Sequence, residues 1–233
     1  MGCIHVFLSH SEVDCWNFSE VHRSRLEREL PGERIRVSAT VDEFVMGLSD
    51  TETAVVWSFR QEWFEPAAKL RRIVTPAAGR DYFKVIPPAG LKIVYSTFHG
   101  RLIAETVLAM MLAENRGIIR GTELQSAGSL WPKHELSLSM RLLYGTTALI
   151  FGFGHIGREI GRLLKPFGVR ILGIRRTIGE VPEYFTDEDR VMEAEDLYCV
   201  LPHADHLILA LPSDTGTDRI VDGKALSLLP SHA

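Results

Sequence analysis

An α/β fold built on parallel sheets is the class that the sequence predicts. The chain has 233 residues, of which 45% are hydrophobic and 24% are charged, a balance typical of a globular protein of one or two domains. Short apolar runs alternate with helical stretches, which is the pattern of βαβ units. One run leads into a glycine-rich turn that opens another helical pattern.

The first half of the chain contributes most of the predicted strands. A helix is expected at residues 19–30, where Pro31 and Gly32 end it. Apolar runs bounded by turn residues predict the strands, at residues 4–8, 34–38, 54–57, 70–75 and 91–96.

A long apolar helix is predicted at residues 101–117. Three- and four-residue spacing places one set of side chains along a single face, and the small ones permit close helix packing. This set is Leu102, Thr106, Ala109 and Ala113. Residues 118–143 show little periodicity and are interpreted as a connection between two domains, 1–117 and 118–233.

A second α/β pattern follows this connection. The run "TTALIFG" predicts a strand, and "HIGREIGRLLKPFG" (residues 155–168) predicts a helix. Further strands are expected at residues 169–174 and 206–212. The predicted helix carries an apolar stripe, formed by Ile156, Ile160, Leu163, Leu164 and Phe167.

The turn between this strand and helix has the spacing G-x-G-x-x-G. Gly152 permits a sharp turn, Gly154 lets a phosphate approach the backbone, and Gly157 allows tight packing of the helix on the sheet. The helix N-terminus offers free N–H groups and a partial positive charge to a pyrophosphate. Because the glycines join a predicted strand to a predicted helix, they indicate a dinucleotide site.

The tip of the next strand indicates which dinucleotide binds. A carboxylate there pairs with the ribose of NAD, whereas arginine accommodates the 2′-phosphate of NADP. This chain has Arg175 and Arg176 at that position. Guanidinium groups pair with phosphate in a forked geometry, so the sequence favours NADP, with NAD as the alternative.

Composition excludes several other classes. The formal net charge is −4, so no basic surface indicates nucleic acid. No apolar stretch approaches the length of a membrane span. Cys3, Cys15 and Cys199 form neither a zinc pattern nor a disulfide framework, so no metal is expected and a reducing cytoplasm is favoured.

Taken together, these motifs resemble the D-isomer-specific 2-hydroxyacid dehydrogenases, in particular the members similar to glyoxylate/hydroxypyruvate reductases. The segments that carry the resemblance are "GFGHIGREIGRLLKPFG", "ADHLILALPSDTGTDRIV", "TPAAGRDYF" and "AETVLAMMLAENR". The resemblance implies a flavodoxin-like substrate domain and a Rossmann-type, doubly wound coenzyme domain, the latter incomplete at its C-terminus. It also implies hydride transfer between a nicotinamide cofactor and a small 2-oxo or 2-hydroxy acid.

The same resemblance assigns roles to individual positions. Ala78 and Gly79 match the loop whose backbone amides hold the substrate carboxylate, although alanine replaces the usual serine there. Arg175 stands where NAD-using members often have aspartate. Other positions match the family's cofactor-binding segments, namely Gly152, Gly154, His155, Ile156, Gly157, Leu211, Pro212 and Thr217.

The family's catalytic arginine, glutamate and histidine are all expected beyond Ala233. Residues 1–233 are therefore expected to contain no catalytic residue and to show no turnover. His99, which precedes the long helix near the expected cleft, is a candidate substrate contact. The likeness also implies a homodimer, with residues 101–117 and 118–143 as candidate contacts.

Two other functions compete with this interpretation. One is a non-catalytic, dinucleotide-sensing protein of the corepressor type, which would use the cofactor to control dimerisation. The other is a hydrolase similar to adenosylhomocysteinase, which shares the glycine turn. That hydrolase would require an acidic ribose partner, which Arg175 does not supply.

Overall fold

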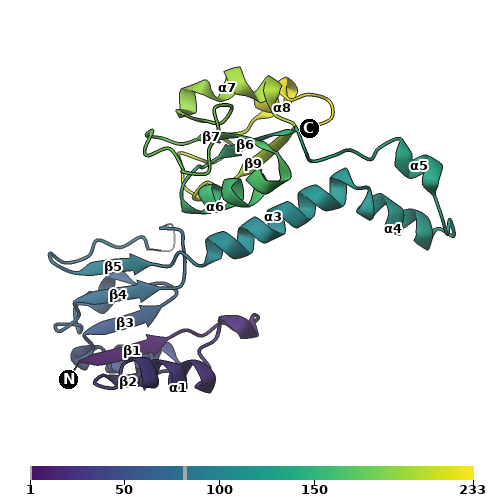
Figure 1. Ribbon diagram of the computed structural model, residues 1–233. Helices are drawn as coiled ribbons and strands as arrows, with labels where there is room; N and C mark the ends of the chain where they lie inside the picture. The colour runs from purple at the N-terminus through teal and green to yellow at the C-terminus, as the bar shows by residue number, and fades with distance from the viewer. Residues whose placement is uncertain (1, 81–82) are drawn as a thin grey trace. The chain divides into compact units, whose positions relative to one another are not determined.

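The computed structural model describes residues 2–80 and 83–233, and the chain divides into two compact units between Ser96 and Thr97. Each unit contains one parallel sheet (Figure 1). The sequence prediction of an α/β fold with parallel sheets is therefore confirmed. None of the described helices is long and apolar enough to cross a membrane.

The first unit contains a five-stranded sheet in the order β2-β1-β3-β4-β5, which is the flavodoxin-like order. Its strands are β1 (Cys3–Phe7), β2 (Arg34–Val37), β3 (Thr53–Val56), β4 (Arg72–Thr75) and β5 (Lys92–Tyr95). Its helices are α1 (Glu20–Glu29) and α2 (Val41–Met46). Ser19 caps α1, and the Thr40 side chain accepts a hydrogen bond from the Glu43 amide at the start of α2.

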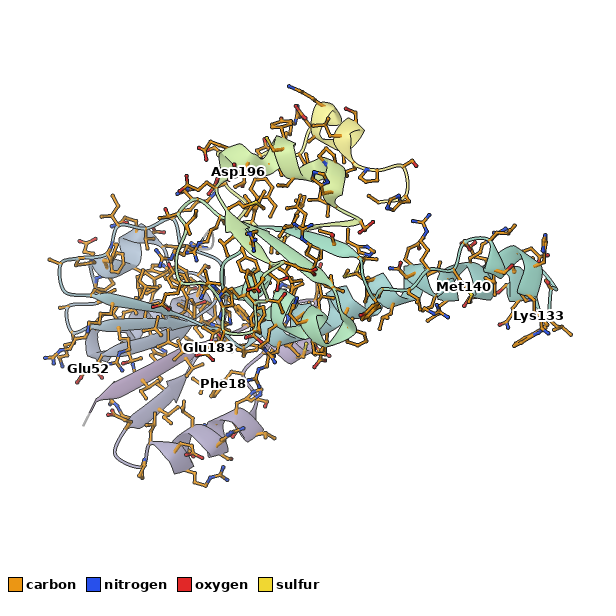
Figure 2. The ribbon with its side chains drawn as sticks, turned by 45° about the horizontal axis from the view of Figure 1, so that its top comes forward. Phe18, Glu52, Lys133, Met140, Glu183 and Asp196 are labelled. Carbon is orange, nitrogen blue, oxygen red and sulfur yellow. The ribbon has the colours of Figure 1, made fainter. Side chains whose placement is uncertain are left out.

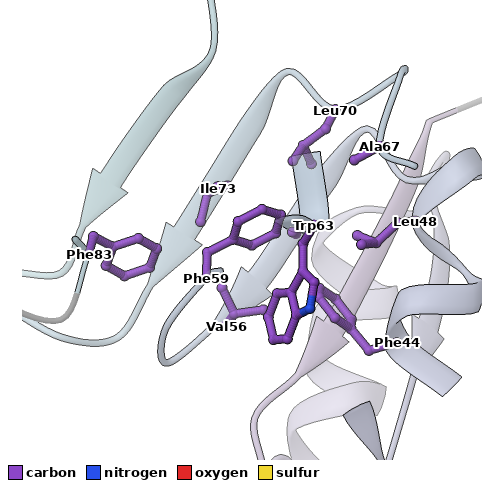
Figure 3. Packing of buried hydrophobic residues seen from close by; sticks show 10 residues of the cluster. Phe44, Leu48, Val56, Phe59, Trp63, Ala67, Leu70, Ile73 and Phe83 are labelled. Carbon is purple, nitrogen blue, oxygen red and sulfur yellow. The ribbon is translucent and has the colours of Figure 1, made fainter. Parts of the chain in front are cut away.

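Aromatic rings fill the core of the first unit. Phe44 lies between Phe7 and Trp63, and Trp63 meets Phe59 edge-on with ring centroids 5.3 Å apart. Figure 3 shows Phe44, Phe59 and Trp63 gathered with Leu48 against the sheet. The core therefore lies on the α2 face of this sheet.

The second unit contains a four-stranded sheet in the order β8-β7-β6-β9, which corresponds to strands 3-2-1-4 of the Rossmann order. Its strands are β6 (Thr147–Phe151), β7 (Arg170–Ile174), β8 (Arg190–Met192) and β9 (His206–Leu209). Its helices are α3 (His99–Asn115), α4 (Ile118–Ser126), α5 (Lys133–Ser137), α6 (His155–Leu164), α7 (Leu197–Val200) and α8 (Gly223–Leu228). Helices α3 and α6 cover one face and α7 and α8 the other, as a doubly wound sheet requires (Figure 1).

The long helix α3 packs through a different face from the one that spacing suggested. Its buried residues are Gly100, Ala104, Met111 and Asn115, and it lies against α6 of the second unit. The predicted face was wrong, because Leu102, Thr106 and Ala109 are exposed and Ala113 is only half-buried. A helix that is apolar all round does not reveal by periodicity which face meets its neighbour. The contacts of α3 group it with residues 97–233, whereas the sequence predicts it as part of a domain 1–117.

Residues 118–143, interpreted from sequence as an irregular connection, form two helices instead. Helix α4 begins after Gly117, which has a left-handed backbone (φ +63°), and α5 follows Pro132. Both helices lie beyond the end of α3, away from the sheet of the same unit (Figure 1). Figure 2 shows Lys133 and Met140 in this segment, which is called the arm below.

A histidine is buried in the sheet of the first unit. His5 on β1 is fully buried, its Nδ1 lies 3.2 Å from the Thr51 hydroxyl, and its Nε2 lies 2.7 Å from that of Ser38. The Thr51 hydroxyl donates to the Gly47 carbonyl, so it accepts from Nδ1–H, and Nε2 accepts from Ser38. Burial, with the charge of Arg36 second, lowers the pKa of His5 to about 4.

Acid is therefore expected to weaken the first unit. Since the folded pKa of His5 lies below its ordinary value, the stability that neutral His5 supports is complete above about pH 6.5 and is lost as the pH falls toward the folded value. Between about pH 7.5 and about pH 5, the wild type should lose about 2 kcal/mol more unfolding free energy than His5→Gln. Urea denaturation followed by tryptophan fluorescence measures this difference, and equal losses in both proteins would refute it.

Candidate functional site: a dinucleotide crevice in the second unit

The glycine turn lies at the carboxyl end of β6, where the strand order of the sheet reverses. Strand β6 pairs with β7 on one side and with β9 on the other. From β6, the sheet continues through β7 to β8 in one direction and to β9 in the opposite direction. Ligands of doubly wound sheets bind in the crevice outside such a switch point. The predicted strand, turn and helix around the turn are all present.

Gly152 and Gly157 are required by the protein's own backbone. Gly152 has φ +99°, and a Cβ there would lie 2.4 Å from the carbonyl oxygen of Ala210, just after β9. A Cβ on Gly157 would lie 2.5 Å from the Gly152 carbonyl oxygen. The turn is thus pressed against β9 on one side and against its own helix on the other.

Gly154 differs from the other two glycines of the motif. It precedes the first residue of α6 with φ −86°, a value open to any residue, and a Cβ there would meet no protein atom within 4 Å. The protein therefore does not need a glycine at this position for its own packing. The space in front of Gly154 is what a phosphate group approaching the backbone requires.

Helix α6 directs its N-terminus at this space. Its first intrahelical bond runs from the Arg158 amide to the Gly154 carbonyl (2.9 Å), so the earlier amides of His155, Ile156 and Gly157 have no carbonyl within the helix. These donors and the helix dipole favour an anion. The turn therefore fits the pyrophosphate of a dinucleotide.

The His155 side chain is directed away from the phosphate space. Its Nε2 donates to the carbonyl of Thr97 at 2.6 Å, next to the start of α3. Gly100 makes this approach possible, because a Cβ there would lie 2.9 Å from the same nitrogen. His155 thus offers the cofactor its backbone amide and uses its ring to hold α6 to the segment before α3.

Two segments flank the turn. Arg175 follows β7 and is half-buried, and Arg176 beside it is exposed. On the other side, Leu211 packs into the core, while the Thr217 hydroxyl donates to the carbonyl of Pro212 at 2.6 Å and closes the loop after β9. The fold thus brings all the sequence-predicted cofactor residues into the second unit.

The loop of residues 175–189, called the β7–β8 loop, is fixed by a carboxylate that sequence reasoning missed. Buried Asp189 accepts hydrogen bonds from the amides of Ile171 and Thr186 and pairs with Lys165 at 2.8 Å. Burial raises the pKa of this carboxyl, but Lys165 and the amides outweigh it and hold the pKa below its ordinary value. A lone aspartate in an acidic stretch gave no sequence signal of this role.

The predicted substrate residues belong to different units. Ala78 and Gly79 follow β4 in the first unit and are half-buried, and the neighbouring Ala77 amide donates to the Thr75 hydroxyl at 3.1 Å. Asp81 of the same motif lies outside the described residues. His99 is the first residue of α3, and its buried Nδ1 has no hydrogen-bond partner among the described residues.

No group of three or more His, Cys, Asp or Glu side chains in the described part of the chain is placed to hold a metal ion. The donors around the turn are amides and guanidinium groups instead, which bind phosphate oxygens rather than cations.

Comparison with known proteins agrees with this geometry. Residues 108–233 match the family profile described as "D-isomer specific 2-hydroxyacid dehydrogenase, NAD binding domain". The chain therefore belongs to the D-isomer-specific 2-hydroxyacid dehydrogenase family, and the sequence-based resemblance is confirmed.

Relatives are found among reductases of small oxo acids. The chain is 30% identical to a glyoxylate reductase of Pyrococcus furiosus over 89% of its own length and 61% of the relative's. It is 29% identical to a glyoxylate reductase of Thermococcus gammatolerans over 99% of its own length and 66% of the relative's. The chain thus spans less than two thirds of the length of these relatives.

Solved structures show the same fold. A D-isomer-specific 2-hydroxyacid dehydrogenase from Xanthobacter autotrophicus, crystallised with NADPH and MES, superposes with a TM-score of 0.79 at 20% identity. The match covers 98% of this chain and 69% of that one. This likeness shows the Rossmann-type fold, and the family profile identifies residues 108–233 as the NAD-binding domain.

The contrast among the three glycines can be tested directly. Gly152→Ala should lower the unfolding free energy by about 2–4 kcal/mol, because it adds a backbone clash to a left-handed conformation. Gly154→Ala should change it by less than about 1 kcal/mol, yet weaken NADPH binding at least ~10-fold by filling the phosphate space. Urea denaturation and calorimetric titration measure the two effects. Unchanged NADPH affinity in folded Gly154→Ala would show that the phosphate lies elsewhere.

Proposed function

We propose that the protein transfers a hydride between a nicotinamide cofactor and a small 2-oxo or 2-hydroxy acid. The space in front of Gly154 at the N-terminus of α6 carries this proposal, since it is the feature that the protein's own packing does not require. Family membership supports the cofactor, and the matched glyoxylate reductases support the class of substrate.

Within this function, the second unit has the task of binding. The amides at the start of α6 would hold the pyrophosphate, and the loop closed by Thr217 would lie beside the cofactor. The cofactor supplies the hydride chemistry when bound. The backbone around Ala78 and Gly79 would hold the substrate carboxylate, with His99 as a further substrate contact.

We further propose that NADP is preferred over NAD. Arg175 and Arg176 directly follow strand β7, and neither forms an ion pair with a carboxylate of residues 2–80 or 83–233. Guanidinium groups at this position would neutralise the negative charge of a 2′-phosphate. A ribose hydroxyl in its place would leave them without a counterion.

Arg175→Ala should therefore weaken NADPH binding ~10–100-fold, because a charge-assisted contact to phosphate is lost. NADH binding should stay within ~2-fold of the wild type, since NADH has no phosphate at this place. Calorimetric titration of residues 1–233 with both cofactors provides the comparison. Tighter binding of NADH by the wild type, with no loss of NADPH affinity in the variant, would overturn the preference.

We also propose that the protein forms a homodimer through α3 and the arm. The arm exposes an unusual number of large apolar side chains, among them Leu130 and Leu138, which are 84% and 76% exposed. Large apolar side chains exposed on one segment indicate a protein–protein interaction site. Met110 on α3 is also exposed, and a second copy presenting the same residues is the occupant we favour.

Replacing Leu130 and Leu138 with glutamate should convert the dimer to a monomer, because each buried carboxylate would be left unpaired. Neither side chain is packed in the monomer, so the fold should persist. Ile86→Glu, at an equally exposed apolar position of the first unit, is the matched control and should leave the dimer intact. Sedimentation velocity measures the mass, and a wild type that is monomeric at all concentrations would rule the dimer out.

We place the protein in a reducing compartment such as the cytoplasm. Its cysteines are all free, with Cys3 buried and Cys15 and Cys199 exposed. Two exposed thiols in an oxidising compartment would be open to unwanted disulfide exchange, which supports this placement.

A further inference from the structure

The β7–β8 loop is held against α6 by hydrogen bonds. The Tyr184 hydroxyl donates to the Arg158 carbonyl on α6 at 2.7 Å, and Asp189 anchors the far end of the loop. Figure 2 shows Glu183 in this loop. Gly161 permits the contact, because a Cβ there would lie 2.9 Å from the Tyr184 oxygen.

Two guanidinium groups contact consecutive residues of the β7–β8 loop. Arg158, the first residue after the glycine motif, donates from a terminal nitrogen to the Glu180 carbonyl at 2.5 Å. The guanidinium of Arg175 lies over Gly179, where a Cβ would lie 3.0 Å from one terminal nitrogen. Since consecutive Cα atoms are about 3.8 Å apart, the two guanidinium groups reach the same short stretch of the β7–β8 loop, one from α6 and one from the residue after β7.

Among the described residues, these cations have no carboxylate partner. Neither Arg158 nor Arg175 forms an ion pair within residues 2–80 and 83–233, although Glu180 and Glu183 belong to the same loop. Arg162, one turn along α6 from Arg158, instead binds Glu159 at 2.8 Å. Both guanidinium groups therefore lack a counterion, which a bound dianion would supply.

We propose that Arg158 is a second phosphate-binding side chain, which together with Arg175 holds the ribose 2′-phosphomonoester of the cofactor. The inference rests on the proposed function and adds a residue that the sequence did not single out. Arg158 extends from the helix that holds the pyrophosphate, and Arg175 from the tip of β7, so the two approach the phosphate from different elements. In this arrangement Arg158 exchanges its bond to the Glu180 carbonyl for one to a phosphate oxygen.

The probes are adenosine 2′,5′-bisphosphate and adenosine 5′-monophosphate, which differ by the 2′-phosphate alone. Arg158→Ala should weaken binding of the bisphosphate and of NADPH ~10-fold or more, while binding of the monophosphate and of NADH stays within ~2-fold. Arg158→Lys should recover part of the loss, because it keeps the charge without the fork. Arg162→Ala is the matched control on the same helix and should resemble the wild type. Calorimetric titration of residues 1–233 gives all of these affinities.

The outcomes separate this inference from the proposed function. Selective loss in Arg175→Ala with none in Arg158→Ala would overturn the role of Arg158 and leave the NADP preference standing. An equal loss of all four ligands in Arg158→Ala would also overturn it, because that result describes a residue that merely positions the loop. If the wild type binds neither nucleotide nor cofactor, the proposed function itself fails.

Discussion

The close approach of the Gly152 backbone to the Ala210 carbonyl is the constraint on which the second unit depends. It lets β6 turn sharply while β9 stays paired at its side, and it fixes where α6 begins. Gly157 continues the constraint by seating the first turn of α6 against the same strand end. The helix N-terminus is consequently directed at the switch point of the sheet, where an anion can be held without any charged side chain.

Contacts outside the crevice keep both of its sides in position. On one side, α3 approaches α6 at Gly100, and the His155 ring binds the Thr97 carbonyl. On the other, Asp189 ties the β7–β8 loop to the end of α6 through Lys165. These groups affect cofactor binding without contacting the cofactor, because a phosphate site depends on amides and guanidinium groups that are already held in position.

The structure also distinguishes residues that are needed for packing from residues that remain available to bind a ligand. The buried faces of α6 and β6 are fully used in packing, whereas packing does not require a glycine at position 154, and Arg158 and Arg175 have no carboxylate partner among the described residues. Similarly, Leu130 and Leu138 of the arm are exposed and belong to neither core cluster of the second unit. Such unused groups are the features from which cofactor binding and dimerisation are inferred.

The sequence by itself determined the fold class, the family and the strand–turn–helix around the glycines, because these depend on local periodicity and on glycine's backbone freedom. It also placed Arg175 at the tip of β7. Only the tertiary structure decided that Gly100 and Ala104, and not Leu102, face α6. It also decided that Asp189 and Arg158 both hold the β7–β8 loop by hydrogen bonds. The physical reason is that these contacts join segments distant along the chain, and local residue patterns do not encode which distant atoms meet.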